Sequence, residues 1–483
     1  MPLVATSSTP SAALADLADR EAVRACLLRY GRGIDRADEQ LARSAFHPDA
    51  TVEISDAGGA TQVDDLVATA APRLSSQHYI SNAVVQVDGD AARSESSYLS
   101  VLATVANDDA PSRVTFAGGR CVDRLQRREG TWAIAHRTLI VEWRAVTDAP
   151  TLEAYLQGMP SPDGLARDLP DGSLQSASAQ LALDRAAVHE QLLLTTRGID
   201  RLDAALLDDS LGAATTLRMG AMTMPGTAFT DRARADAGSR IATQHFVANH
   251  LIEVEGDRAR SEAYLFGSIG YAPGAGPPQL TGDKGGVVLS GLRYVDLWSR
   301  VDGRWRLTER VLGGAWSVTL DVAAMATLAD DPHADGHRDE QDPSYRRAAW
   351  TSQPQTAEAT IERDAIERCV LDRVRGIDQR DAALLEEVHD DPAAAGRLLA
   401  AQEPGTTTRH HVLNCLVDLG AGPDRASCET YVLEVRAEGD AFLLEGRREL
   451  VDLVHVAGRW RIREVTPVRE WRAPLPTASW LAS

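Results

Sequence analysis

The stretch DREAVRACLLRYGRGIDRAD, Asp19–Asp38, returns twice in the chain, as DRAAVHEQLLLTTRGIDRLD at Asp184–Asp203 and as ERDAIERCVLDRVRGIDQRD at Glu362–Asp381. Each copy has a Gly-Ile-Asp that ends sixteen residues after its first acidic residue. The apolar residues of the first copy follow the spacing of an amphipathic helix, at Val23, Cys26, Leu27, Tyr30 and Ile34. An internal repeat determines the architecture of a chain, so we predict three copies of one unit.

Two further landmarks follow each helix in the same order. The motifs SQHYISN, TQHFVAN and TRHHVLN place a His and an Asn at matched positions, in Ser76–Asn82, Thr243–Asn249 and Thr408–Asn414. Each unit then closes on two tryptophans eleven residues apart, at Trp132 and Trp143, Trp305 and Trp316, and Trp460 and Trp471. Three ordered landmarks that each occur three times indicate a triplication.

The segments after each His motif alternate or run apolar and turn at Gly-containing loops, which is typical of β-hairpins. Helices followed by a run of antiparallel strands predict the α+β class, with helices packed on a curved antiparallel sheet. The motif Asp and motif His are 43, 45 and 32 residues apart in the three units. The third unit is therefore predicted to be shorter by about one strand.

The repeats also predict the domain organisation. We expect a disordered tail at residues 1–18, three domains at 19–146, 181–320 and 361–475, and linkers at 147–180 and 321–360, the second of them acidic. His333 and His337 lie in the acidic linker, where a solvated segment is favoured over a metal site because metal ligands need a rigid frame. The Gly/Pro-rich stretch Tyr271–Gly291 is expected to be a long hairpin loop.

Composition excludes several classes of function. The 483 residues have 50 basic and 70 acidic side chains, a formal charge of −20, which weighs against nucleic acid and anionic membrane surfaces as partners. No apolar run approaches the roughly 20 residues of a membrane span. The five Cys are scattered without CxxC pairs, so a cytoplasmic location is expected. Lys284, the only lysine, lies in the Gly/Pro-rich stretch, which disfavours Schiff-base chemistry.

The motifs together resemble those of the nuclear transport factor 2-like superfamily, in its SnoaL-like branch. The resemblance rests on D-R-x-A-V/I, (G)-I-D-x-x-D, Q-H-(Y/F)-x-x-N, V-D-G-D-x-A-x-(S/A) and D-G-x-W-x-(I/L) with a second Trp. It implies a cone-shaped α+β barrel for each of the three tandem domains. The superfamily includes dehydratases, a dehydrochlorinase, isomerases, epoxide hydrolases, cyclases and binding domains, so the fold alone does not select a reaction.

The resemblance also implies site residues. Scytalone dehydratase, bile acid 7α-dehydratase and hexachlorocyclohexane dehydrochlorinase share an Asp-His dyad, which by motif position falls on Asp35 with His78, Asp200 with His245, and Asp378 with His410. An Arg of the dehydrochlorinase matches Arg137 and Arg310, where the third unit has Val465. A Tyr of the bile acid enzyme matches Tyr30, where the other units have Thr195 and Arg373, and its second acid falls on Val101, Gly267 and Glu434.

A dyad of this kind is suited to proton abstraction. A neutral His is the best general base near physiological pH, and a buried carboxylate holds its tautomer and stabilises the imidazolium. We therefore predict a lyase or isomerase, without cofactor or metal, for a small, fairly apolar cyclic substrate. The first unit is expected to be the principal site, with His78 as base, Asp35 orienting it, Arg137 at the leaving group and Tyr30 at a substrate oxygen. The second unit is the reserve.

Other interpretations stay open at this point. The motif Asp residues could only end helices, and the motif His residues could only fill the core. A SnoaL-like cyclase, or a scaffold whose cones bind small molecules without catalysis, would carry the same motifs. Since related dehydratases form homotrimers or dimers, three joined copies predict a monomer with a pseudo-threefold arrangement of its domains.

Overall fold

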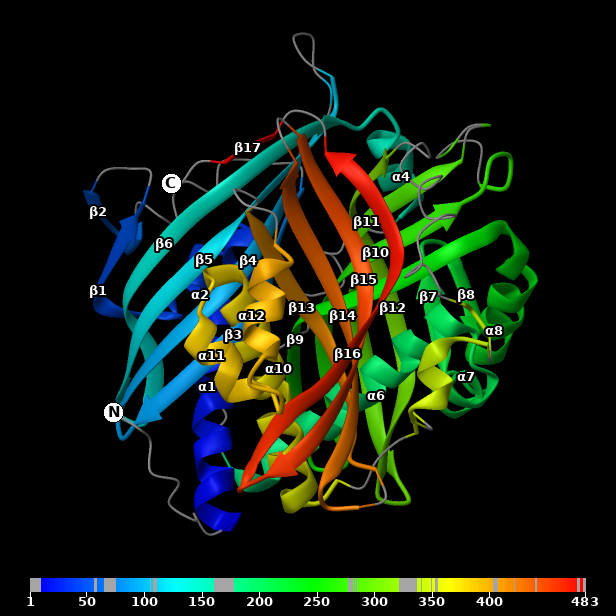
Figure 1. Cartoon of the computed structure of the whole chain (residues 1–483). Helices are drawn as coiled ribbons and strands as arrows, with labels where there is room; N and C mark the ends of the chain where they lie inside the picture. Colours follow the sequence, from blue (N-terminus) through cyan, green and yellow to red (C-terminus); the bar gives the residue numbers. More distant parts are fainter. Residues whose placement is uncertain are drawn as a thin grey trace.

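The chain forms three sheets, each with one long helix lying against it (Figure 1). The computed structural model describes residues 10–55, 59–64, 75–104, 106, 111–159, 178–276, 281, 283, 285–320, 337–339, 341–348, 350–351, 355–402, 407–420, 422–438, 441–475 and 478–480. The long helices are α1 (Pro10–Asp35), α6 (Ala179–Arg201) and α10 (Ala357–Gln379). None of the described helices is long and apolar enough to cross a membrane.

The first two units have the same sheet order. In the first unit it is β2-β1-β6-β5-β4-β3, built from β1 (Phe46–Ile54), β2 (Gly59–Gln62), β3 (Ser75–Asp88), β4 (Ala91–Thr104), β5 (Arg113–Arg128) and β6 (Thr131–Asp148). In the second it is β8-β7-β12-β11-β10-β9, built from β7 (Thr216–Met219), β8 (Met222–Pro225), β9 (Arg240–Glu255), β10 (Arg258–Tyr271), β11 (Gly286–Val301) and β12 (Arg304–Leu320). The pairs β1–β6 and β7–β12 are parallel and the rest are antiparallel.

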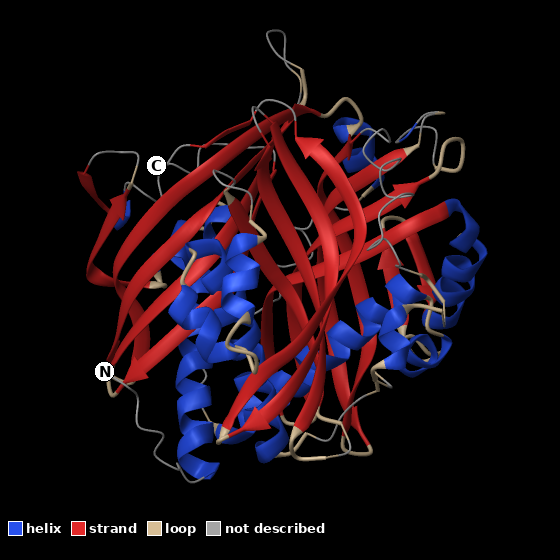
Figure 2. Cartoon of the chain, viewed as in Figure 1, coloured by secondary structure: helices blue, strands red, loops and turns tan. Residues whose placement is uncertain are grey.

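Among the described residues, the third unit has four strands, β13 (Thr408–Asp418), β14 (Arg425–Glu438), β15 (Ala441–Val456) and β16 (Arg459–Leu475). The predicted shortening corresponds to the small outer strand pair, where the chain has an isolated parallel bridge between His389 and Ile462, flanked by the short helices α11 (Ala382–Val388) and α12 (Ala394–Ala400). Near the chain end, β17 (Ala478–Trp480) pairs with β6 of the first unit. The predicted α+β architecture, with helices on curved and mainly antiparallel sheets, is confirmed (Figure 2).

The I-D-x-x-D motif ends one helix and begins the next. Asp38 accepts a hydrogen bond from the backbone N–H of Leu41 at 2.9 Å and so caps α2 (Glu39–Arg43). In the other units the same capping begins α7 (Ala204–Ser210) and α11. The Gly before the motif permits close packing, because a Cβ at Gly33 would lie 2.4 Å from the backbone N of Ala42. The second Asp of the motif is thus structural, which leaves the first Asp for the site.

The predicted tail and the predicted second linker differ from the structure. Helix α1 begins at Pro10, not after residue 18, because Leu14 and Leu17 supply one more buried turn. The first linker contains α4 (Leu152–Gly158). In the second linker, Asp342 and Trp350 are fully packed against the domains, so the expectation of a solvated acidic segment is wrong there. Residues 1–9, 160–177 and 321–336, which include His333, lie outside the described residues, as does Lys284.

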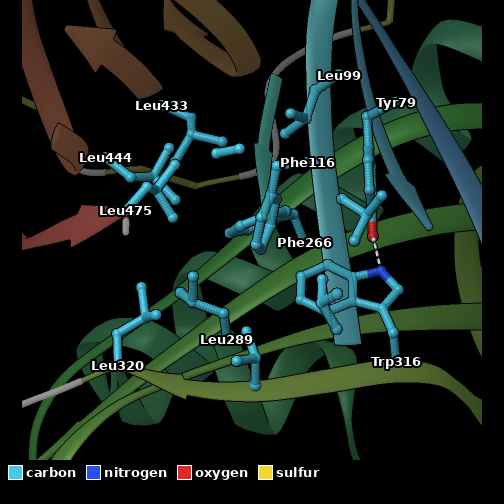
Figure 3. Packing of buried hydrophobic residues seen from close by; sticks show 14 of the residues in the cluster. Tyr79, Leu99, Phe116, Phe266, Leu289, Trp316, Leu320, Leu433, Leu444 and Leu475 are labelled. Carbon is cyan, nitrogen blue, oxygen red and sulfur yellow. Dashed lines mark hydrogen bonds between the residues drawn. The ribbon is translucent and has the colours of Figure 1, made fainter. Parts of the chain in front are cut away.

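Because side chains alternate along each strand, one set packs into the core of its own unit and the other set packs into a cluster shared by all three units. In β3, Tyr79 packs into a cluster common to all three units, whereas its neighbour Ile80 packs under α1 in the core of the first unit. The shared cluster holds the second Trp of every unit, Trp143, Trp316 and Trp471. Figure 3 shows the Trp316 indole N–H donating to the Tyr79 hydroxyl, at 3.2 Å, across the first and second units.

The contacts between units repeat around a ring. The Arg of each R-G-I-D motif forms an ion pair with a strand Glu of the next unit: Arg32 with Glu262 at 3.0 Å, Arg197 with Glu429 at 2.8 Å, and Arg375 with Glu95 at 3.3 Å. Each Glu also pairs with an Arg on the neighbouring strand of its own sheet, which is Arg293, Arg448 or Arg120. The first unit contacts the second, the second the third, and the third the first, so the ring closes within one chain.

Candidate active site

The three predicted Asp-His pairs are each in direct contact. In the first unit, Asp35 ends α1 with a fully buried side chain, and its Oδ1 lies 2.6 Å from Nδ1 of His78 on β3. Oδ2 of Asp35 accepts the backbone N–H of His78 at 2.8 Å, and Oδ1 also accepts the hydroxyl of Ser76 at 2.8 Å. With Nδ1 of His78 donating to this carboxylate, Nε2 is the ring nitrogen that remains as an acceptor.

The second and third units repeat this geometry. Nδ1 of His245 lies 2.6 Å from Asp200, and Nδ1 of His410 lies 2.5 Å from Asp378. In both units the same carboxylate also accepts the backbone N–H of its His, at 2.9 Å. The histidine side chains of the first two units keep 19% and 14% of their surface exposed, and no hydrogen bond from another described residue reaches their Nε2 atoms. These two nitrogens are available to a substrate.

The third dyad is blocked. Nε2 of His410 lies 3.2 Å from Glu434, so that both ring nitrogens face carboxylates, and only 5% of the side chain is exposed. Burial alone would lower the pKa of His410, but Asp378 and Glu434 outweigh it and raise the pKa to about 9. Arg447 in turn pairs with Glu434. A histidine that is already protonated at neutral pH has no lone pair for proton abstraction.

Strand register also corrects the position of the second acid. His410 pairs with Glu434, His245 with Gly267, and His78 with Ser100. The counterpart of Glu434 in the first unit is therefore Ser100, and Val101 was wrong by one residue. The error arose because the position was counted from the strand Tyr. Tyr98 lies two residues before the partner of its His, whereas Tyr264 lies three residues before the partner of its own.

The predicted Arg residues are held by buried aspartates. Arg137 makes two hydrogen bonds to Asp123 across β5 and β6, at 2.8 and 2.9 Å, and its guanidinium stacks on the ring of Tyr30 at 4.4 Å. Nη1 of Arg137 is buried and has no hydrogen-bond partner among the described residues. Burial raises the pKa of Tyr30 well above its usual value, so its hydroxyl is a donor. No hydrogen bond links this group to the His78 dyad within the described chain.

The second unit also combines a Tyr, an Asp, a His and an Arg, which the comparison of the three repeats in the sequence missed. Arg310 bonds twice to Asp296, at 2.8 and 2.7 Å, and stacks on Tyr294 at 3.8 Å. Tyr294 comes from strand β11, whereas Tyr30 comes from a helix, so aligning helix positions alone could not find it. The signal was the R-Y-V-D that stands where the first unit has R-C-V-D.

In the third unit two valines replace this buried pair. Val451 lies opposite Val465 in the sheet, at the position where Asp123 faces Arg137 in the first unit. Losing both partners together avoids an unpaired buried charge. The third unit therefore lacks the cationic donor of the other two, in addition to having a blocked His.

The Asn of each His motif reaches into the preceding unit. Asn249 donates from Nδ2 to the carbonyl of His78 at 2.5 Å and accepts the backbone N–H of Ile80 at 2.8 Å. Asn414 makes the same two contacts around His245, and Asn82 makes them around His410. The sequence showed these residues as a repeated landmark without indicating that each one acts on a neighbouring unit.

Metal ligands do not gather anywhere in the described part of the chain: no three His, Cys, Asp or Glu side chains form a group that could hold an ion. His337, which was considered with His333, is exposed and donates its backbone N–H to Asp342 at 3.0 Å.

Comparison with known proteins agrees with the fold. The profile of the SnoaL-like domain matches residues 15–138 and 180–311, more than half of the chain. Among curated proteins, none matches this sequence. Similar solved structures include a Kribbella flavida protein, with 23% identity over 28% of this chain and 92% of that chain and a TM-score of 0.25. A function-unknown Mycobacterium tuberculosis protein has 26% identity over 26% and 71% of the two chains and a TM-score of 0.23.

A putative scytalone dehydratase from Novosphingobium aromaticivorans has 19% identity, covers 27% of this chain and 87% of that chain, and gives a TM-score of 0.23. The domain profile, its two occurrences and the helix-on-curved-sheet units give the same result: the chain belongs to the SnoaL-like family.

Proposed function

We propose that this chain is a lyase or isomerase whose first and second units abstract a proton from a small, largely apolar cyclic substrate. The proposal rests on two histidines, His78 and His245. In each of them Nδ1 is held by a buried Asp and Nε2 has no hydrogen-bond partner among the residues that the structure describes. The third unit serves to complete the ring, because His410 is held between two carboxylates.

The chemistry follows from the groups around each dyad. Nε2 of His78 takes a proton from an activated C–H bond, and the electron pair of that bond forms the new double bond while the leaving group departs with its own pair. Nη1 of Arg137, buried without a partner, is a donor for the oxygen or halide on which charge grows. When hydroxide leaves, the imidazolium can return the proton to it, so that water is released. In an isomerisation, the proton returns to another carbon.

The apolar core of the first unit supports an apolar ring as the substrate. Tyr30 and Phe46 pack edge to face in the core of the first unit, with centroids 5.5 Å apart, and Ile80 and Leu139 pack against the same cluster. Apolar surroundings strengthen the few polar contacts made inside them. The buried charges of Arg137 and Asp123 form an ion pair and so neutralise one another.

The test is turnover of a panel of cyclic β-hydroxy ketones and polychlorinated cyclohexanes, with products identified by mass spectrometry and C–H exchange followed in D2O. We expect His78→Gln and His245→Gln each to lower the turnover rate in part. The double variant should lower the turnover rate at least 10²-fold. His410→Gln is the matched control and should leave turnover within twofold. Full activity in the double variant would overturn the mechanism and favour a ligand-binding scaffold.

A further inference from the structure

A cavity of about 330 Å³ lies where the three long helices meet. Its walls come from α1, α6 and α10 and from the strands β3, β9 and β13 beneath them. None of the six dyad residues lines it. Its volume falls within the range of small-molecule sites, which is roughly 300–1,000 Å³.

Two sets of equivalent apolar residues contribute to the wall. Leu28, Leu193 and Leu371 occupy the same position on the three helices, and Ile80, Val247 and Val412 occupy the same position on the three strands. Each unit thus contributes one residue to each set, which is the arrangement expected around a pseudo-threefold axis. An apolar occupant is favoured by such a wall.

The polar residues of the wall break the threefold equivalence. One helix position is Arg24 in the first unit, His189 in the second and Glu367 in the third. Arg24 lies 2.8 Å from Glu21 and 3.8 Å from Asp364, so its charge is already balanced. The cavity lining as a whole has five acidic and four basic side chains, so neither sign of charge is in large excess and no charged ligand is specifically favoured.

A histidine pair provides the uncharged polar contact. Nδ1 of His189 and Nδ1 of His250 lie 2.9 Å apart, which requires one ring to donate and the other to accept. Burial lowers the pKa of both rings, so the pair is neutral. Nε2 of His250 is buried and has no hydrogen-bond partner among the described residues. Such an atom is costly to bury unless something bonds to it.

We propose that this axial cavity is a binding site for one small, uncharged, largely apolar molecule that carries a hydroxyl or carbonyl oxygen. The site is separate from the dyads and does not depend on their catalytic role. The ring of leucines and branched residues holds the body of the molecule, and the histidine pair holds its oxygen. Both other units have a larger side chain where the second has Ala186, namely Glu21 and Asp364, so the helix can accept a bulkier residue there.

The test uses two fluorescent naphthalene probes, 6-propionyl-2-(dimethylamino)naphthalene, which is neutral and carries a carbonyl oxygen, and 8-anilino-1-naphthalenesulfonate, which is anionic. With the full chain we expect one neutral probe per chain, bound at least tenfold more tightly than the sulfonate. Ala186→Leu, which fills the cavity, should weaken the neutral probe at least tenfold. His78→Gln, in the first dyad, should leave its affinity unchanged.

Ala25→Leu on the first helix fills the cavity from another side. It replaces Ala186→Leu if thermal unfolding shows that the Ala186→Leu variant does not fold. The proposal is overturned if the neutral probe shows no saturable binding, if filling the cavity leaves its affinity unchanged, or if the sulfonate binds as tightly. Loss of binding in His78→Gln would place the probe in the first cone and would also overturn it. None of these results depends on turnover, so failure of the catalytic proposal would be seen separately.

Discussion

Asn249 of the second unit holds the backbone on both sides of Tyr79, by donating to the carbonyl of His78 at 2.5 Å and accepting the N–H of Ile80 at 2.8 Å. The base of the first dyad is therefore oriented from two directions, by Asp35 at its ring and by a neighbouring unit at its backbone. A site positioned in this way depends on how the units dock.

The first prediction concerns this contact. Asn249→Ala should lower kcat of the first unit by about 10- to 100-fold, because both hydrogen bonds that fix the strand at His78 are lost. It is measured in a His245→Gln background, where only the first dyad contributes. Asn82→Ala is the matched control, since it removes the same clamp from the blocked His410. Equal losses of kcat in the two variants would show that the clamp acts only through stability.

The second prediction concerns the buried pair of the first cone. Arg137→Val alone should cost about 3–5 kcal/mol in the free energy of unfolding, because Asp123 is left buried without its partner. Adding Asp123→Val reproduces the Val451–Val465 arrangement of the third unit and should recover most of that loss. Denaturant unfolding measures both steps. The double variant should fold yet lose activity at the first dyad, and full activity in it would exclude a catalytic role for Arg137.

The third prediction is a pH dependence. Because the folded pKa of His410 is about 9 and its ordinary value is 6.5, its contribution to stability is complete below about pH 6.5 and is lost as the pH rises toward 9. The contribution is at most about 3 kcal/mol. Chemical unfolding at several pH values should show the decline, and Glu434→Gln should make it shallower. A stability that rises through this range would contradict the assignment.

The fourth prediction tests the second linker. Asp342 bonds Arg448 through both oxygens and lies 3.5 Å from Arg201, and all three side chains are fully buried. Asp342→Ala should destabilise the chain by about 3–5 kcal/mol, because two buried guanidinium groups lose a counter-ion. Asp339→Ala, at an exposed position of the same segment, should change stability by less than about 1 kcal/mol. If the two variants have equal stability, the linker is not part of the packed structure.

The fifth prediction concerns assembly. We propose that the chain is a monomer in solution, since each unit's Arg–Glu pair is satisfied within the ring and β17 returns to the first unit. Light scattering should give a mass near 52 kDa. A mass near three times that value would show that the chain is one subunit of a larger assembly.

The sequence by itself determined the repeat and the α+β class, and its resemblance to a known superfamily implied the three Asp-His pairs. The repeat and the fold class depend on features that recur at fixed spacing along the chain, such as the helical period before Asp35 and the strand that carries His78. Local periodicity decides which face of an element is buried, so these features can be recognised without knowing how the units dock. The catalytic role of the pairs remains a prediction.

Tertiary structure decided which pairs can work and what surrounds them. Strand register places Glu434 opposite His410, and it places Tyr294 diagonal to Arg310, where the ring stacks on the guanidinium. Asn249 acts on His78 across 171 residues of chain, and the axial cavity exists only where three helices converge. Contacts between units depend on the shape and twist of whole sheets, which no short motif encodes. The repeat made the parts of this protein recognisable, and the packing of the three copies made them unequal.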